Sequence, residues 1–148
     1  MVVLVVLLSV FVVAWGLLAI AQRPHQIPTA GCIAFAALFM FTGISHFALA
    51  DGMVQMLPTW VPGRYPIIYI TGMMEILLGL GLLWPSVRRI AGLLTLAFLV
   101  AVFPSNIYAA LNSIEFGGNV NGPNYLFFRV PLQLFLLGWV WWMAVRRY

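Results

Sequence analysis

The sequence predicts an all-α, polytopic membrane protein with five transmembrane helices. Of its 148 residues, 64% are apolar and only 7% are charged, and the mean hydropathy is +1.07. This composition lies far outside that of soluble globular domains. A hydrocarbon core about 30 Å thick takes roughly 20 helical residues to cross, and five apolar segments reach that length. They are residues 2–21, 28–50, 66–84, 90–111 and 126–145.

The first segment is interpreted as a retained span. It has no charged region before its apolar stretch, and it is longer than the core of a typical signal peptide. A cleaved signal peptide is the alternative interpretation. The fourth segment contains Pro104, which frees backbone groups and is expected to kink that helix.

Four connections join the segments, at residues 22–27, 51–65, 85–89 and 112–125. The connection 51–65 contains Pro58, Pro62 and Gly63, which argue against a regular helix and predict an ordered cap over the mouth of the bundle. The connection 112–125 has three glycines and a proline among asparagines. That composition is typical of a turn-rich loop, either a plain connector or a mobile lid.

The arginines predict the orientation of the chain. With five spans, one side of the membrane receives a single loop arginine, Arg64, together with Asp51 and Glu115. The opposite side receives Arg23, Arg88, Arg89, Arg146 and Arg147. Because cytoplasmic loops carry an excess of basic residues, the N-terminus is predicted outside and the C-terminus inside. Both long connections then face outside.

Several function classes are excluded by composition. The single cysteine, Cys32, permits no intrachain disulfide and no dithiol redox motif. His25 and His46 lie about 30 Å apart along the helix, at opposite membrane faces, so one chain cannot supply a bis-histidine haem. No dinucleotide glycine motif or P-loop is present. The formal charge of +4 reflects topology, so no nucleic-acid partner is predicted.

Polar residues of four helices converge on one membrane layer. Glu75 lies within an apolar segment, where a carboxylate is costly unless it is paired, protonated or wetted, and such residues usually mark function. Counted from the outer ends of their spans, His46, Asn106, Arg129 and Gln133 share the outer half-layer with Glu75. The sequence therefore predicts an outward-facing polar pocket.

Roles follow from side-chain chemistry. Glu75 and His46 are the candidate catalytic residues, because a desolvated carboxylate and an imidazole both titrate near working pH. The candidate ligand-binding residues are Asn106, Arg129, Gln133, Trp60, Tyr108 and Thr71. For Trp60, anchoring at the membrane interface is favoured over a place in the pocket, because tryptophan prefers that depth. The structural alternative for the whole group is a buried Glu75–Arg129 ion pair that locks the bundle.

Six motifs in fixed order carry a family resemblance. They are FTGISHF (41–47), MLPTWVP (56–62), TGMMEILLGLGLL (71–83), RRIAG (88–92), FPSNIYAAL (103–111) and RVPLQ (129–133). On these the chain resembles the DoxX-like family of small bacterial integral membrane proteins. The resemblance implies a four-helix membrane bundle over residues 28–148, with residues 1–27 adding one helix and a linker. It also implies a multi-pass protein of the bacterial plasma (inner) membrane, and some relatives are subunits of quinone-linked oxidation systems.

Three functions remain open at this stage. The first is a pocket that binds a quinone or another lipophilic small molecule, in an accessory component of a membrane redox system. No cofactor is predicted to be covalently bound, and a redox partner protein would bring the electron carrier. The second is a non-catalytic assembly or chaperone-type subunit. The third is transport of a small solute or a proton, for which intramembrane carboxylates are typical.

A metal site is the least favoured expectation. His46, Met53, Met56 and Met73 lie near the outer side, and thioether with imidazole ligands suits Cu(I). Their spacing matches no fixed ligand motif, and methionine commonly fills gaps in helical cores.

Overall fold

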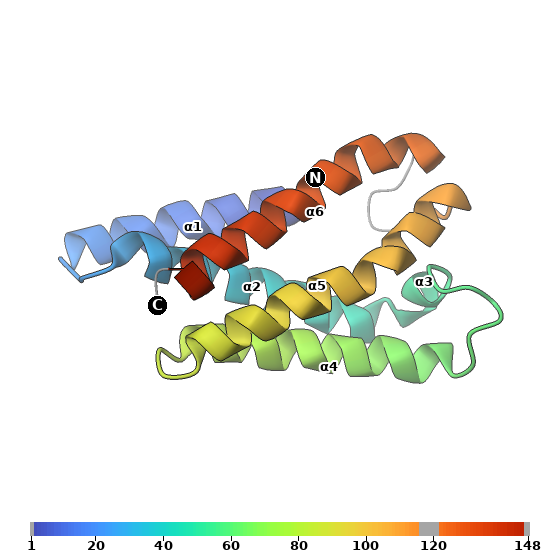
Figure 1. Ribbon diagram of the computed structural model, residues 1–148, viewed down its shortest axis with the longest axis horizontal. Coiled ribbons are helices and arrows are strands. Elements are labelled where there is room, and N and C mark those ends of the chain that lie inside the picture. Colours follow the sequence, from blue (N-terminus) through green and yellow to red (C-terminus); the bar gives the residue numbers. More distant parts are fainter. Residues whose placement is uncertain (1, 116–121, 147–148) are drawn as a thin grey trace.

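Long helices dominate the computed structural model of the chain, which describes residues 2–115 and 122–146. The long helices are α1 (Val2–Ile20), α2 (Gln26–Ala48), α4 (Arg64–Leu83), α5 (Arg88–Leu111) and α6 (Leu126–Val140) (Figure 1). The short elements are α3 (Ala50–Val54), the 3-10 turn η1 (Gly122–Tyr125) and the π-helical turn η2 (Trp141–Arg146), which continues α6. The described residues contain no strand, and five helices are long and apolar enough to cross a membrane. The prediction of an all-α chain with five such helices is confirmed.

Turn residues set the helix boundaries. Gln22 and His25 adopt left-handed backbone conformations, with φ of 51° and 53°, and turn the chain between α1 and α2. Gly63, with φ of 65°, directly precedes α4, where a residue without a Cβ meets no strain. Pro28 and Pro66 lie in the first turns of α2 and α4, where the missing N–H leaves no intrahelical bond unmade.

The helix α2 is the most buried of the long helices and packs most extensively against α4 and α1. Small residues allow the α2–α4 approach, because close packing replaces the hydrophobic driving force between helices in lipid. A Cβ added at Gly72 would lie 2.5 Å from His46 Cβ and 3.0 Å from the Gly43 carbonyl oxygen. One added at Gly79 would lie 3.2 Å from the carbonyl oxygen of Ala36. The crossing of α2 and α4 therefore depends on glycine.

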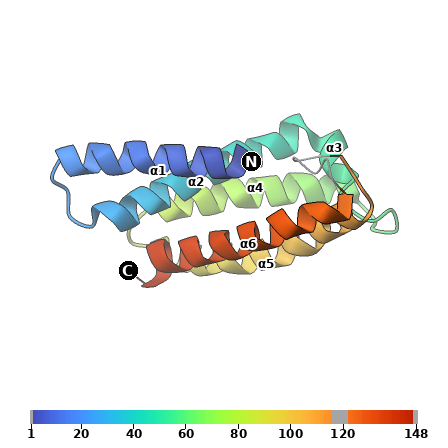
Figure 2. The same ribbon diagram turned by 90° about the horizontal axis from the view of Figure 1, so that it is seen from above.

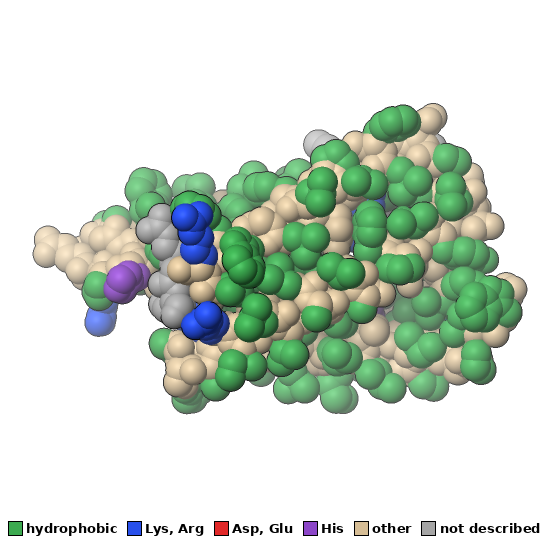
Figure 3. All heavy atoms as spheres, viewed as in Figure 1, with side chains coloured by type: hydrophobic (Ala, Val, Ile, Leu, Met, Phe, Trp, Pro, Cys, Tyr) green, Lys and Arg blue, Asp and Glu red, His purple; other side chains and the backbone are tan. Residues whose placement is uncertain are grey.

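The end of the molecule opposite α3 is held by side-chain contacts between α2, α5 and the α6–η2 segment. Trp139 Nε1 donates a hydrogen bond to the carbonyl oxygen of Gly31 at 3.1 Å. Arg88 is buried and its Nε donates to the Leu82 carbonyl oxygen at 2.7 Å, which caps the last turn of α4. In the face drawn in Figure 3, the visible Arg and His side chains gather at this end of the elongated molecule. We call it the arginine end, and the end with α3 and η1 the pocket end.

A buried amide joins α5 to α6, which lie side by side (Figure 2). Gln133 Nε2 donates to the carbonyl oxygen of Leu99 at 2.7 Å, and Gln133 is 4% exposed. Toward the pocket end from this bond, both helices contain a proline, Pro104 in α5 and Pro131 in α6. The hydrogen bond therefore joins α5 to α6 on the side of both prolines that faces the arginine end.

Removing this amide should loosen the α5–α6 contact. Gln133→Leu keeps the side-chain size but loses the hydrogen bond, and interhelical bonds of this kind contribute about 0.6–2 kcal/mol in membranes. We expect a lower midpoint of unfolding in mixed detergent, read by circular dichroism. The control is Asn112→Ala, since Asn112 is exposed and its side chain donates to the Tyr108 carbonyl oxygen in the last turn of α5. Equal loss in the two variants would contradict this role for Gln133.

The connection between α2 and α4 differs from expectation in its first part. Residues 50–54 form the short helix α3, in a stretch where the prolines were taken to exclude a regular helix. The reason is that Pro58 and Pro62 lie beyond this turn, so that their restrictions do not reach it. Ala50 and Val54 are buried against Ile68 of α4, with Met53 and Leu57 packed beside them. Of the predicted loop 112–125, residues 116–121 lie outside the described part of the chain.

Candidate functional site

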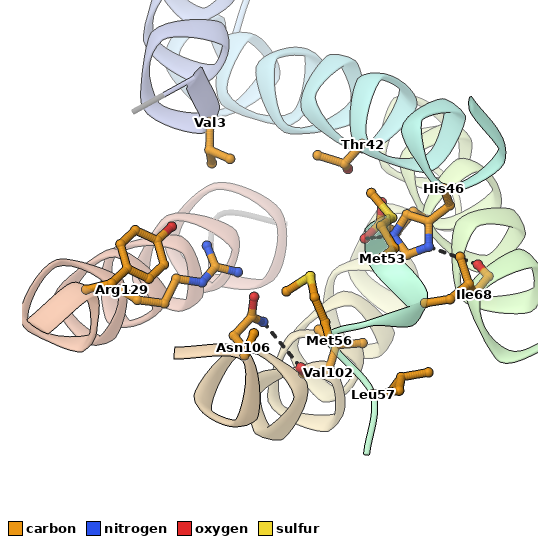
Figure 4. Close-up of a pocket in the computed structure, with 13 residues that line it drawn as sticks. Val3, Thr42, His46, Met53, Met56, Leu57, Ile68, Val102, Asn106 and Arg129 are labelled. Carbon is orange, nitrogen blue, oxygen red and sulfur yellow. Dashed lines mark hydrogen bonds and ion pairs between the residues drawn. The ribbon is translucent and has the colours of Figure 1, made fainter. Parts of the chain in front are cut away.

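A cavity of about 220 Å³ lies at the pocket end, between the long helices (Figure 4). Its wall combines apolar side chains with a few polar ones that come from different helices. The lining residues are Val3 of α1; Thr42 and His46 of α2; Met53, Met56 and Leu57 of α3 and the following turn; Ile68 and Glu75 of α4; Val102, Asn106 and Ala109 of α5; Tyr125 of η1; and Arg129 of α6. An apolar enclosure with few convergent polar groups is the usual form of a small-molecule site.

His46 and Glu75 face each other in this wall. His46 Nε2 lies 3.7 Å from Glu75 Oε1. On the other side of the ring, His46 Nδ1 lies 2.9 Å from the Ile68 carbonyl oxygen and 3.1 Å from Thr71 Oγ1. The Ile68 oxygen can only accept, so Nδ1 carries a hydrogen and donates it. Nε2 is then the ring nitrogen that faces Glu75.

The facing arrangement of the two side chains favours a form of the pair with a proton on one of them. A neutral His46 with its hydrogen on Nδ1 would present a lone pair to the carboxylate, and two acceptors facing each other repel. A proton on either Nε2 or Glu75 removes this repulsion, as an imidazolium–carboxylate pair or as an imidazole facing a carboxylic acid. Both forms have zero net charge. The pair therefore places two groups capable of proton transfer side by side in the cavity wall.

Backbone contact holds His46 in place. Its Cβ packs directly against Gly72, one turn before Glu75 on α4. Thr71, which also contacts Nδ1, has hydroxyl contacts to the carbonyl oxygens of Ile67 and Ile68, both at 2.9 Å. The imidazole thus lies between a glycine and a helix carbonyl, which fixes the ring plane and the nitrogen that faces Glu75.

Glu75 keeps an unused oxygen. The residue is 8% exposed, and its Oε2 is buried without a hydrogen-bond partner in the described part of the chain. A buried carboxylate oxygen without a partner is costly, so such atoms need an explanation such as a ligand, a proton or water. Glu75 lines the cavity, so a molecule in that space can reach it.

Asn106 and Arg129 belong to the α5 and α6 walls of the same cavity (Figure 4). Asn106 Nδ2 donates to the carbonyl oxygen of Val102 within α5 at 3.3 Å. Arg129 directs its guanidinium group into the cavity, and its Nε is buried without a hydrogen-bond partner among the described residues. Within residues 2–115 and 122–146, the carboxylate of Glu75 pairs with His46 and not with Arg129. The proposed structural lock between Glu75 and Arg129 is absent.

Of the eight predicted site residues, four line the cavity: His46, Glu75, Asn106 and Arg129. Thr71 contacts His46 from behind the lining. The other three lie elsewhere. Gln133 is used in the bond to Leu99, Trp60 is 81% exposed, and Tyr108 is partly buried but not part of the lining.

The sulfur atoms of the predicted copper set divide between two environments. Met53 and Met56 line the cavity together with His46, whereas Met73 is 57% exposed and lies outside the lining. The described residues contain no group of three or more His, Cys, Asp or Glu side chains that could hold a metal ion. The structure therefore brings His46, Met53 and Met56 together at the cavity and places Met73 outside the lining.

Sequence reasoning missed several lining residues. Leu57 and Tyr125 come from the connections, where no helical periodicity places a side chain. Val3 and Val102 are apolar and carry no signal that separates a cavity wall from a lipid-facing surface. The one usable signal was helical spacing, because Ala109 shares a face with Asn106 on α5.

A comparison with protein families matches residues 35–144 to the family described as Domain of unknown function (DUF8561). The match begins within α2, includes every polar residue of the cavity, and leaves α1 outside. No curated protein and no solved structure gave a significant match. Because the matched segment covers well over half of the chain, this protein belongs to the DUF8561 family.

Proposed function

We propose that the cavity binds a lipophilic small molecule of the quinone type, and that the protein is an accessory component of a membrane redox system. The observation that carries the proposal is the His46–Glu75 pair in a largely apolar enclosure, with one carboxylate oxygen unused. A purely structural ion pair gains most when all its lone pairs are satisfied. An unused oxygen facing a cavity favours a partner that comes and goes.

The volume and lining of the cavity suit a ring with polar edges. About 220 Å³ corresponds to roughly seven water volumes of about 30 Å³ each, which accommodates a head group but not a long chain. A quinone ring needs an apolar slot and hydrogen-bond donors at its two carbonyl oxygens. The proton shared by His46 and Glu75 serves one carbonyl, and it is available for transfer when the ring is reduced. The chain of the ligand would extend into the surrounding lipid.

The proposal includes an orientation of the protein in the membrane. The arginine end lies inside and the pocket end outside, following the excess of Arg23, Arg88, Arg89 and Arg146 at one end. The helices α2, α4, α5 and α6 form the functional four-helix bundle, and α1 is an addition to it. The resemblance to DoxX-like proteins supports a bacterial plasma membrane location and a redox partner protein that supplies electrons. That resemblance rests on sequence motifs alone.

The proposal predicts saturable quinone binding by the purified protein in lipid nanodiscs. The probe is decylubiquinone, followed by quenching of tryptophan fluorescence. Val102→Phe narrows the cavity and should weaken binding by about tenfold, or about 1.4 kcal/mol. Val100→Phe is the matched control, because Val100 lies two residues away on α5 and is 59% exposed.

The outcome decides between the two leading functions. Saturable binding that responds to Val102→Phe alone supports a ligand site. If no saturable binding occurs, or if both variants weaken it equally, the quinone proposal fails. An assembly subunit is then favoured. A protein partner that still copurifies with the Glu75→Gln and His46→Ala variants would support that function.

A further inference from the structure

Arg129 carries a full positive charge in the cavity wall, which is more than a neutral quinone needs from a hydrogen-bond donor. Its guanidinium group points into the cavity from α6 (Figure 4), and its Nε is buried with no hydrogen-bond partner in the described residues. A guanidinium ion stays protonated in proteins and offers five N–H donors. A cation held in an apolar wall without a counter-charge is costly, so its retention needs a compensating interaction.

In the described part of the chain, Arg129 forms no ion pair with an acidic side chain. The chain has three acidic residues, Asp51, Glu75 and Glu115. Asp51 accepts a hydrogen bond from the Tyr65 hydroxyl at 2.8 Å on the exposed surface, and Glu115 is exposed. Glu75 pairs with His46 Nε2 at 3.7 Å, so its carboxylate is already engaged in the α2–α4 wall. Arg129 contributes a fixed positive charge to the lining, and Glu75 acts on it through space without forming an ion pair.

We propose that the natural occupant is a lipophilic acid, whose ionised oxygen pairs with Arg129. This inference rests on the proposed function and narrows its substrate class from lipophiles in general to anionic ones. A carboxylate or a ring enolate can accept two parallel hydrogen bonds from a guanidinium group. The rest of the molecule is apolar, because Val3, Leu57 and Val102 form much of the remaining wall.

The arrangement of the cavity also sets the orientation of the bound molecule. A carboxylate or an enolate near Glu75 would meet a second acidic group, whereas at Arg129 it meets a fixed cation. The neutral oxygen of the ligand therefore faces His46 and Glu75, where it can receive the shared proton. Charge and proton exchange are thus assigned to opposite ends of the ligand.

A pair of matched probes tests the inference. The acid is 2-hydroxy-3-alkyl-1,4-naphthoquinone, which is ionised at neutral pH, and the control is its 2-methoxy ether, which has nearly the same shape and no charge. In wild-type protein in nanodiscs of neutral lipid, the acid should bind about tenfold more tightly than the ether. Arg129→Gln should reduce that ratio to about one, while Arg129→Lys should keep part of it because the point charge remains.

A second pair of probes separates acid recognition from ring recognition. A long-chain fatty acid and its methyl ester carry the same charge difference without a quinone ring. If the fatty acid also binds more tightly than its ester, and Arg129→Gln removes the difference, then the acid group itself is recognised. If only the hydroxyquinone shows the preference, the ligand is an acidic quinone. Either result supports an anionic occupant.

The failures of the inference and of the proposed function are distinguishable. Equal binding of acid and ether by the wild-type protein overturns the inference and leaves the neutral quinone site in place. A preference for the acid that persists in Arg129→Gln overturns it also, because the charge would then be read elsewhere. Binding of neither member of either pair overturns both proposals. The wild-type ratio needs no variant, so the test holds even if Arg129→Gln does not fold.

Discussion

Replacing Glu75 by glutamine should weaken ligand binding by about tenfold or more while leaving the protein as stable as the wild type, or more stable. Glutamine has nearly the same size, so the α2–α4 packing is preserved. It cannot hold or release the proton shared with His46, and it removes a buried carboxylate whose second oxygen has no partner in the described residues. Function should therefore fall without a loss of stability.

This combination of outcomes separates a functional residue from a structural one. If the His46–Glu75 pair only locked α2 to α4, the substitution would lower the midpoint of thermal unfolding. Binding of decylubiquinone and thermal unfolding are measured on the same nanodisc preparation. The matched control is Glu115→Gln, which neutralises an exposed carboxylate beyond the end of α5 and should alter neither quantity. A stability loss without a change in binding would contradict the proposed role.

Gly72→Ala is expected to have the largest effect on the fold. The new Cβ would lie 2.5 Å from His46 Cβ, closer than real Cβ contacts come, and 3.0 Å from the Gly43 carbonyl oxygen, tighter than most of them. Because the second of these contacts is backbone, α2 and α4 must move apart, and overpacking of this kind costs about 1–3 kcal/mol. The displacement also moves His46 away from Glu75, so ligand binding should fall with stability.

The control for this prediction is Gly138→Ala in α6. A Cβ at Gly138 meets no atom within 4 Å, so the substitution introduces no clash. Its unfolding midpoint in mixed detergent should equal or exceed that of the wild type, because alanine has the higher helix propensity. If Gly72→Ala and Gly138→Ala behave alike, the close crossing of α2 and α4 is not what positions His46.

The long helices could be predicted from the sequence because membrane thickness sets a minimum length for each. The predicted segments 28–50 and 90–111 correspond to Gln26–Ala48 and Arg88–Leu111, within two residues at each end. Local features were not predictable in this way. The helix α3 and the π-helical turn η2 each depend on a few backbone bonds and on tertiary packing, neither of which leaves a periodic pattern.

The candidate site was predictable where one polar residue stood out on an apolar helix. His46, Glu75, Asn106 and Arg129 each had to face protein or water, and four such faces converge in one cavity. Gln133 shares a face with Arg129, yet one turn further along α6 it bonds to Leu99 instead of lining the cavity. Sequence spacing gives the face of a helix, but not the depth at which neighbouring helices meet.

The pairing within the site depended on distances that no sequence pattern contains. Charge alone favoured an ion pair between Glu75 and Arg129, because these are the acidic and the permanently basic residue of the predicted polar layer. The close approach of α2 to α4 at Gly72 instead brings His46 to 3.7 Å from Glu75 and leaves Arg129 across the cavity. Helix packing therefore decided which base pairs with the acid, and with it which group remains available to a ligand.

Photo-crosslinking in native membranes tests the central claim most directly. The probe is an azido-substituted quinone, and labelled peptides are identified by mass spectrometry with and without excess decylubiquinone. A ligand in the cavity should label lining residues such as Met56 and Leu57, and the excess quinone should suppress that labelling. Labels confined to exposed residues such as Leu77 and Leu134, or labels that excess quinone does not reduce, would contradict a ligand-binding cavity.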